Sequence, residues 1–367
     1  MKITRIEVYA VRFSLKTQFR LSGGRVFDEM DSTFVALHTD AGLTGWGEAC
    51  PWSPTYCPEF SGGVRAGMAV LAPALLSLDP VQVDVVTHAM DKSLMGHWYA
   101  KAAVDLACWD LAGKVAGRPA CDLLGGRFDA EMKMNRGVIA DTLTAMQERI
   151  ELLRTEGCST FSCKMQANDI DSDIEIINAL LSDRRHGERY VADYNGGMTV
   201  ADAIRFSQGV ESPHLMIEQP CRSYEECRQA SERMSHPVRL DEVIMTPADA
   251  ARAISDGCAQ GIVIKIGRVG GLTKSRHIRD ICSRSGTPIA VQDSGGSDIA
   301  SAGVTHLARA TPAHVLHSVV DLRYFADRVI FDGVPDSVNC RMAASNEPGL
   351  GVTPREGELG DPIASYA

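Results

Sequence analysis

The sequence lacks the marks of several classes of protein. None of its eleven cysteines belongs to a Cys-x-x-Cys pair, and an odd number suits neither a complete disulfide framework nor a zinc site. We therefore expect reduced thiols in a cytoplasmic protein. The longest apolar run, Met68 to Leu76, is far shorter than a membrane span and contains Pro73. The first residues alternate like a strand and do not resemble a signal peptide.

A surplus of basic residues is also missing. The 37 Lys and Arg residues against 47 Asp and Glu residues give a net charge of −10, which argues against a nucleic-acid partner. What is present is an ordinary globular mixture, with 45% hydrophobic and 23% charged residues over 367 positions. This length favours two domains and supplies enough apolar residues for a large core. We expect a small-molecule partner and no membrane partner.

The first 125 residues show the pattern of strands followed by helices. Residues 3–13 and 32–39 alternate apolar and polar side chains, whereas residues 62–117 repeat apolar side chains at helical spacing. Strands followed by helices are typical of an α+β domain, which we place over residues 1–125. The tail, residues 325–367, lacks any such period, and we expect it to fold back onto this domain.

Residues 126–324 repeat a strand-like run and a helix-like segment in alternation. Eight such steps are what a (β/α)₈ TIM barrel requires. An open doubly wound sheet has the same local pattern and is the alternative. The eight runs span residues 132–135, 158–165, 190–193, 215–218, 238–242, 262–266, 288–293 and 315–321.

Three consecutive runs of this repeat end in a carboxylate. Asp193, Glu218 and Asp241 close the third, fourth and fifth runs, and the active sites of barrels lie at these strand ends. Each acid alone is as well explained by a helix N-cap or a surface ion pair. Three carboxylates at one dry mouth, however, require a cation to neutralise them. Oxygen ligands favour Mg²⁺, with Mn²⁺ as the alternative.

Two lysines flank these carboxylates. Lys164 ends the second run and Lys265 ends the sixth. Either lysine alone could pack its stem and extend its amine to water. Together they place two amines across one bound substrate, on opposite sides of a barrel mouth. Desolvation and a nearby cation disfavour the ammonium form, so one of the two can act as a neutral base.

The order of these five residues resembles that of the enolase superfamily, in its mandelate racemase and muconate lactonizing enzyme group. The resemblance extends over the whole chain, and its further motifs are Gly45–Glu48, Ala103–Leu111, Val269–Gly271 and Pro348–Gly351. It implies a modified (β/α)₇β barrel with an N-terminal capping domain. It also implies that Lys164 and Lys265 are catalytic, that Asp193, Glu218 and Asp241 bind Mg²⁺, and that α-proton abstraction proceeds through a metal-stabilised enediolate.

Shorter motifs narrow the resemblance. Glu48–Pro51, Pro54–Tyr56 and Glu218–Cys221 are similar to the branch that acts on proline derivatives. Leu240–Ile244 and Arg341–Ser345 are most similar to its cis-3-hydroxy-L-proline dehydratases. This implies dehydration to Δ1-pyrroline-2-carboxylate. Two positions depart from the pattern. Ser162 stands where many relatives have a lysine, and Gly295 stands where an aromatic wall is expected.

Three further residues are candidates for substrate contact. Tyr56 lies in a proline-rich loop that would close over the barrel mouth, although a surface tyrosine fits the sequence equally well. Asp293 and Asp298 follow the seventh run, and either one could bind a substrate amine or orient Lys265. Simple turn formation is their alternative explanation.

The sequence leaves three other functions open. A racemase or epimerase could use the same two lysines on a proline derivative or betaine. A Schiff-base aldolase would use one lysine as a nucleophile. A metal-bound carboxylate-binding protein without turnover is the non-enzymatic alternative, although all five positions are filled. We expect a homo-oligomer, as is common for large acidic barrels.

Overall fold

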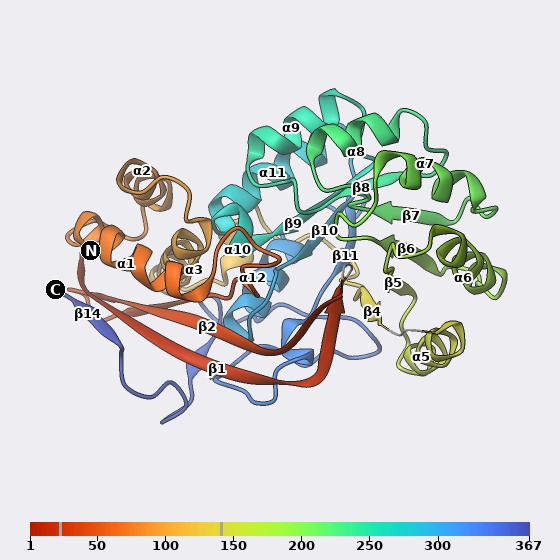
Figure 1. Ribbon diagram of the computed structural model, residues 1–367. Coiled ribbons are helices and arrows are strands. Elements are labelled where there is room, and N and C mark those ends of the chain that lie inside the picture. The colour runs from red at the N-terminus through yellow and green to blue at the C-terminus, as the bar shows by residue number, and fades with distance from the viewer. Residues whose placement is uncertain (22–23, 140–141) are drawn as a thin grey trace.

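The computed structural model describes residues 1–21, 24–139 and 142–367. Its N-terminal part is an antiparallel sheet covered by helices (Figure 1). The sheet has the strand order β14-β1-β2-β3, so the last strand of the chain pairs with the first. These strands are β1 (Ile3–Leu21), β2 (Arg25–Thr39), β3 (Thr44–Ala49) and β14 (Ala364–Tyr366). The tail thus returns to the N-terminal sheet.

The hairpin of β1 and β2 is longer than the sequence pattern indicates. The predicted strand ends at Phe13, whereas β1 continues to Leu21 after a shift in register between Ser14 and Phe19. This irregularity interrupts the alternation, so the second half of the strand is not recognisable from period alone. Beyond the shift, Phe19, Leu21 and Phe27 form a small apolar cluster of their own. The end of the hairpin beyond the register shift is therefore apolar.

Three helices cover the sheet: α1 (Ser61–Leu75), α2 (Val83–Ser93) and α3 (Trp98–Ala116). Helix α3 is buried along almost its whole length and packs on β3. The close approach explains the glycines of β3. A Cβ atom at Gly47 would lie 1.7 Å from the carbonyl oxygen of Ala103, and one at Gly45 would lie 2.3 Å from that of Ala107. Only glycine fits at such a distance.

The second part of the chain is a curled sheet of eight parallel strands, ordered β11-β10-β9-β8-β7-β6-β5-β4. A bridge between Met134 and Val319 joins its two edges, which completes the barrel. The predicted barrel with a capping domain is confirmed. The strands are β4 (Arg136–Val138), β5 (Thr160–Lys164), β6 (Arg189–Asp193), β7 (Leu215–Glu218), β8 (Val238–Leu240), β9 (Gly261–Lys265), β10 (Ile289–Gln292) and β11 (Leu316–Val319).

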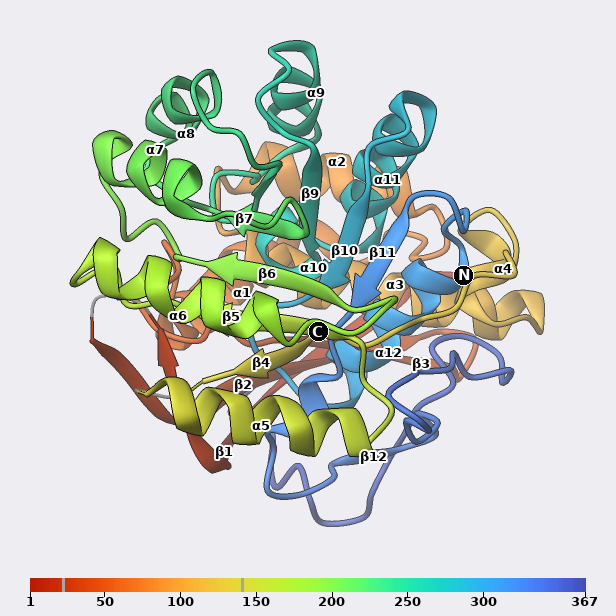
Figure 2. The same cartoon turned by 90° about the vertical axis from the view of Figure 1, so that its right-hand side faces the viewer.

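Helices surround this sheet on its outer side (Figure 2). Several begin at side chains that accept a hydrogen bond from the first turn, as Thr246 does for α9 and Ser223 for α8. Within the described residues no helix is long and apolar enough to cross a membrane. The helices are α5 (Leu143–Thr155), α6 (Ile170–Ser182), α7 (Val200–Gly209), α8 (Tyr224–Ser231), α9 (Pro247–Ser255), α10 (Ile266–Val269), α11 (Leu272–Ser285) and α12 (Asp298–Arg309).

Short elements complete the chain. They lie before the barrel and in the tail, and one of them, η1, directly follows β11. These elements are α4 (Ala120–Leu123), the 3₁₀ helix η1 (Leu322–Tyr324), β12 (Phe331–Asp332) and β13 (Thr353–Pro354).

The cysteines correct one expectation. Cys158 and Cys340 form a disulfide, with an S–S distance of 2.02 Å, so the prediction of reduced thiols throughout is wrong for this pair. The other nine cysteines, all within the described residues, are free and buried. The two partners are 182 residues apart in sequence, and a single pair at that separation leaves no local spacing signal. The bond ties the tail to the segment before β5.

Candidate active site at the barrel mouth

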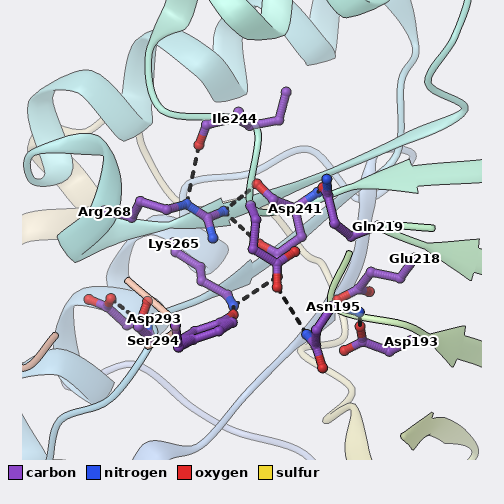
Figure 3. Close-up of polar contacts among 12 residues, drawn as sticks. Asp193, Asn195, Glu218, Gln219, Asp241, Ile244, Lys265, Arg268, Asp293 and Ser294 are labelled. Atoms are coloured by element: carbon purple, nitrogen blue, oxygen red, sulfur yellow. Dashed lines mark hydrogen bonds and ion pairs between the residues drawn. The ribbon is translucent and has the colours of Figure 1, made fainter. Parts of the chain in front are cut away.

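The five residues singled out by the sequence lie at the C-terminal ends of the barrel strands, and Figure 3 shows four of them, Asp193, Glu218, Asp241 and Lys265. Lys164, Asp193 and Glu218 are the last residues of β5, β6 and β7, and they stand beside one another in register. Asp241 directly follows β8, and Lys265 is the last residue of β9. Parallel strands end at the same rim of a barrel, which is why residues so far apart in sequence converge.

Each of the three carboxylates is buried against a cation. Lys164 donates a hydrogen bond to Asp193, and the Nε atom of Arg239 donates to Glu218 at 2.6 Å. Asp241 accepts from Arg268 at 2.5 Å and forms an ion pair with Lys265 at 2.8 Å. All three carboxylates are at least 97% buried. Such charges need compensation close by.

The sequence patterns do not predict a role for either of the two arginines in these pairs. Arg239 is the middle residue of the buried strand β8, and Arg268 lies in α10, the short helix that follows Lys265. Both are almost completely buried. An arginine within an apolar run of the sequence can indicate a buried ion pair, because arginine is rarely buried without an acidic partner. It indicates a nearby acid but does not say which one.

Burial and the neighbouring charges both act on the carboxylates of the mouth. Burial raises the pKa of Glu218 to about 7; Arg239 opposes the rise, and the charges of Asp193 and Asp241 add to it. Burial also acts to raise the pKa of Asp241, but Arg268 and Lys265 hold it below its usual value. The mouth thus brings together three carboxylates, each of which is balanced by a lysine or an arginine.

The side chains are paired with lysine and arginine and do not surround a common point. Within the described ranges, no group of three His, Cys, Asp or Glu side chains has the arrangement of a metal site. The donor set nevertheless fits magnesium by its chemistry, since it offers three carboxylates on neighbouring strand ends. Lys164 occupies Oδ2 of Asp193, and the backbone of Asn195 donates to Oδ1 at 3.0 Å.

Tyr56 reaches the site from the capping domain. Lys265 donates a hydrogen bond through Nζ to the hydroxyl of Tyr56. The same nitrogen lies 4.9 Å from the centre of the tyrosine ring. Both residues line one cavity of about 320 Å³, together with Lys164, Asp193 and Glu218. Burial keeps the pKa of Tyr56 well above its usual value, so the hydroxyl is neutral.

The two candidate aspartates after β10 lie in different places. Asp293 lines the cavity and accepts backbone hydrogen bonds from Gly267 and Ser294 at 2.8 and 2.7 Å, while burial raises its pKa to about 6. The Oδ2 atom of Asp298 instead accepts from the backbone of Ile330 and Phe331, both at 2.9 Å. Asp298 is not among the described residues that line the cavity. The structure therefore does not bring it together with the others.

Aromatic rings line the cavity from a direction that the sequence did not suggest. Phe19, Trp52 and Phe325 meet at its edge, with 4.5 Å between the ring centres of Phe19 and Trp52 and 5.2 Å between those of Phe19 and Phe325. The expected wall at Gly295 is absent because a Cβ atom there would lie 3.0 Å from the Sγ of Cys50. The rings come instead from β1, from the segment after β3 and from the residue after η1.

Two family models match the chain. Residues 5–125 match the N-terminal domain of mandelate racemase and muconate lactonizing enzyme, and residues 145–358 match the enolase C-terminal domain-like model. Together they cover most of the chain. The chain belongs to the mandelate racemase and muconate lactonizing enzyme family.

Individual relatives are similar over most or all of the chain. The cis-3-hydroxy-L-proline dehydratase of Roseibium aggregatum is 39% identical, with all of both chains covered. The hydrophobic dipeptide epimerase of Enterococcus faecalis is 28% identical over 78% of this chain and 80% of the epimerase. Among solved structures, an enolase superfamily member from Roseovarius nubinhibens complexed with magnesium is 36% identical. It has a TM-score of 0.95 and covers 100% of this chain and 99% of its own.

Proposed function

We propose that the chain is a Mg²⁺-dependent hydro-lyase that dehydrates cis-3-hydroxy-L-proline to Δ1-pyrroline-2-carboxylate. The placement of Lys164 and Lys265 carries this proposal. Their strands, β5 and β9, are four positions apart in a barrel of eight strands, so the two amines face each other across the mouth. The 39% identity to a dehydratase over the whole chain supports the choice of substrate.

The metal would be held by Asp193, Glu218 and Asp241. When bound, Mg²⁺ neutralises the negative charge that develops on the substrate carboxylate when the α-hydrogen leaves. The position of the three carboxylates on neighbouring strand ends supports this assignment. A magnesium-loaded sample should melt at a higher temperature than an EDTA-treated one, and Glu218→Gln should remove most of that difference while leaving the barrel folded.

The two lysines divide the acid and base work. In cis-3-hydroxy-L-proline the hydroxyl and the carboxylate lie on the same ring face, and the α-hydrogen lies on the other. Elimination therefore needs a base on one face and an acid on the opposite one. One lysine takes the α-proton, the other protonates the departing hydroxyl, and the C3–O bond breaks to release water. The enamine that remains tautomerises to the imine.

The protonation of Lys164 depends on its partner. Burial favours the neutral amine, but Asp193 and Glu218 outweigh it and raise the pKa of Lys164. A lysine held in this way is an acid and not a base.

Neighbouring residues would orient the reacting groups. The hydroxyl of Tyr56 accepts a hydrogen bond from the amine of Lys265 and would hold that amine toward the substrate. Asp293, fixed by two backbone hydrogen bonds, would receive the ring nitrogen of the substrate. Asp298 has no such place, since its contacts are to the tail.

A single incubation tests the proposal. The magnesium-loaded protein is mixed with proline, the hydroxyproline isomers and proline betaine in D₂O, and mass spectrometry follows water loss and deuterium uptake at Cα. We expect water loss from cis-3-hydroxy-L-proline alone. Dehydration of none of the isomers, together with exchange of another acid, would retain the lysine site and reject the substrate.

The aromatic rings favour a second candidate, epimerisation of a proline betaine. Phe19, Trp52 and Phe325 present ring surfaces to the cavity, and such surfaces attract quaternary ammonium groups. The absence of a ring at Gly295 therefore does not count against a betaine. In the same incubation, deuterium uptake by the betaine with inversion at C2 and no water loss would establish this activity.

We also propose a homo-oligomeric enzyme of the cytoplasm, made of a capping domain (residues 1–125, completed by 325–367) and a barrel (residues 126–324). The pairing of β14 with β1 supports the completion of the capping domain by the tail. Met95 and Phe60 in the capping domain are exposed apolar side chains that would suit a subunit contact. Light scattering on the purified chain would measure the oligomeric state.

A further inference from the structure

Gln219 directly follows Glu218 at the rim of the barrel, is completely buried and has no role in the proposed reaction so far. Its main chain is bonded to both neighbouring strands. The N–H group of Gln219 donates to the carbonyl of Arg239 in β8 at 2.9 Å, and its carbonyl accepts from the N–H of Gly196, in the loop after β6, at 2.8 Å. One residue thus joins the ends of the three strands that carry the three carboxylates.

The side-chain amide of Gln219 is held by both of its polar atoms. Oε1 accepts a hydrogen bond from the backbone N–H of Asp241 at 2.9 Å, and Nε2 donates to the carbonyl of Cys221 at 3.0 Å. Because one partner is a donor and the other an acceptor, the amide has a single orientation that satisfies both. Figure 3 shows Gln219 beside Asp241. The side chain therefore adds a second connection between β7 and the end of β8.

Asp241 depends on such a connection more than the other two carboxylates do. Those two are the last residues of β6 and β7 and are paired with each other within the sheet. Asp241 instead lies one residue past the end of β8, beyond the paired part of that strand. Arg268 donates to its carbonyl oxygen and to its carboxylate. The N–H of Asp241 is bound by Gln219, which couples the backbone of Asp241 to that of Glu218.

The backbone of Gln219 has an uncommon conformation. Its φ angle is 36°, in the left-handed region that a residue with a long side chain seldom adopts. Such a conformation costs free energy and persists only where the surrounding contacts hold it. The hydrogen bonds of the main chain and of the side-chain amide provide this hold. Strained residues of this kind are concentrated at binding and active sites, which points to a demand of the site on this position.

We propose that Gln219 is a positioning residue that fixes Asp241 relative to Glu218 and thereby makes the site prefer Mg²⁺ to larger divalent cations. This rests on the proposed metal site. Mg²⁺ requires near-ideal octahedral geometry at short distances, whereas Ca²⁺ accepts longer and more variable ones. Carboxylates whose backbones cannot move apart therefore discriminate against Ca²⁺. Groups that orient metal ligands without touching the metal usually contribute roughly tenfold to a hundredfold in affinity.

The experiment measures metal binding without turnover. Metal-stripped protein is titrated by calorimetry with Mg²⁺ alone and with Ca²⁺ alone, in the wild type and in Gln219→Met. Methionine has a similar length, and its sulfur is only a weak acceptor for the N–H of Asp241. We expect the Kd for Mg²⁺ to rise by roughly tenfold to a hundredfold and the Kd for Ca²⁺ to change much less. The preference for Mg²⁺ should therefore fall by most of that factor.

Two further variants make the result specific. Gln260→Met is the matched control, because Oε1 of Gln260 accepts from the N–H of Val238 at 2.9 Å, the same kind of bond at the other end of β8. It should keep the wild-type preference. Gln219→Asn guards against misfolding, since asparagine tolerates a positive φ but its amide is one methylene too short to reach Asp241. It should lose the preference as Gln219→Met does, and melting curves without metal would confirm folding.

Each outcome decides something. A wild type without preference for Mg²⁺, or a preference that survives in a folded Gln219 variant, would overturn the role of Gln219. Equal loss of both ions, or failure of both Gln219 variants to fold, would assign this residue to the fold of the rim alone and also overturn it. A wild type that selects Mg²⁺ through Gln219 but dehydrates no hydroxyproline isomer rejects the proposed substrate and leaves this role in place. Binding of neither ion rejects the metal and the role together.

Discussion

Single residues at the mouth are held in opposite-charge pairs, and their chemistry depends on which partner each one keeps. Lys164 is bound to Asp193, and Lys265 is bound to Asp241 and Tyr56. Removing one member of such a pair leaves the other charge buried without compensation. Substitutions here must therefore be tested for folding as well as for activity.

The first prediction concerns the two lysines. Lys164→Ala and Lys265→Ala should each lower kcat for α-proton exchange and dehydration by roughly 10²–10⁴-fold, the usual contribution of a general acid or base. Stopped assays by mass spectrometry would measure both rates, with melting curves to confirm folding. Lys92→Ala, an exposed lysine on α2, is the control. A near-wild-type rate in either active-site variant would exclude the two-lysine mechanism.

The second prediction concerns Glu48, which is buried where β3 meets α12. Its carboxyl group accepts hydrogen bonds from Ser32, Ser297 and Ala300. Burial raises the pKa of Glu48 from 4.5 to about 7. The folded state holds this proton more tightly than the unfolded state does. The contribution of Glu48 to the free energy of unfolding is therefore fully present below pH 4.5 and is lost as the pH rises through about 7.

The free energy of unfolding should accordingly fall by up to about 3 kcal/mol between these pH values on account of Glu48. Urea titrations from pH 4.5 to 8 would measure it in the wild type and in Glu48→Gln. The glutamine cannot titrate, so the variant should show a flatter dependence. Parallel curves for the two proteins would show that Glu48 keeps its ordinary pKa.

At the scale of elements, the β1–β2 hairpin links the capping domain to the barrel. Its end carries Phe19, and Lys164 lies 5.7 Å from the centre of that ring. The strand that is part of the capping sheet thus also forms a wall of the active site. Cross-strand pairing fixes the hairpin along the rest of its length, so that the ring is held in place by the sheet.

The third prediction tests this wall. Phe19→Leu keeps an apolar side chain and removes the ring, so KM for proline betaine should rise by roughly twofold to thirtyfold, the range of a cation–π contact. KM for a substrate without a quaternary ammonium should change much less. Phe60→Leu, an exposed phenylalanine at the start of α1, is the control. Equal changes for both substrates would assign Phe19 a role in packing only.

At the scale of the whole molecule, the C-terminal tail ties the two domains together. β14 pairs with β1 in the cap, Asp298 of the barrel binds the tail backbone, and Cys340 is bonded to Cys158. The disulfide closes a loop of 182 residues, which restricts the unfolded chain strongly. The tail is therefore a structural link and not a free extension.

The fourth prediction follows from that bond. Cys340→Ser should lower the free energy of unfolding by about 2–5 kcal/mol, the usual cost of losing a native disulfide. Cys158→Ser and the double variant should lose the same amount, since each breaks the same bond. Denaturant titration would measure stability, and thiol counting should find nine free thiols in the unfolded wild type. Additive losses, or eleven thiols, would contradict the bond.

The sequence by itself determined the barrel, the capping domain and the five residues at the strand ends. This was possible because each signal is local: Leu215–Glu218 and Pro247–Ser255 are recognisable from their own apolar period and capping residues. A polar residue that closes an apolar strand is recognisable in the same way. Once eight parallel strands are inferred, their ends must share one rim, so Lys164, Asp193 and Glu218 must converge.

Only the tertiary structure decided which partners these residues have. Arg239 and Arg268 compensate Glu218 and Asp241, Cys158 meets Cys340, and Arg136 stacks on Tyr324. None of these contacts can be predicted from the repeat of about 2 residues in a strand or about 3.6 residues in a helix. Each contact joins elements whose separation along the chain is arbitrary. The shape and charge of the cavity depend on all of these contacts together. The contacts form only when the chain folds.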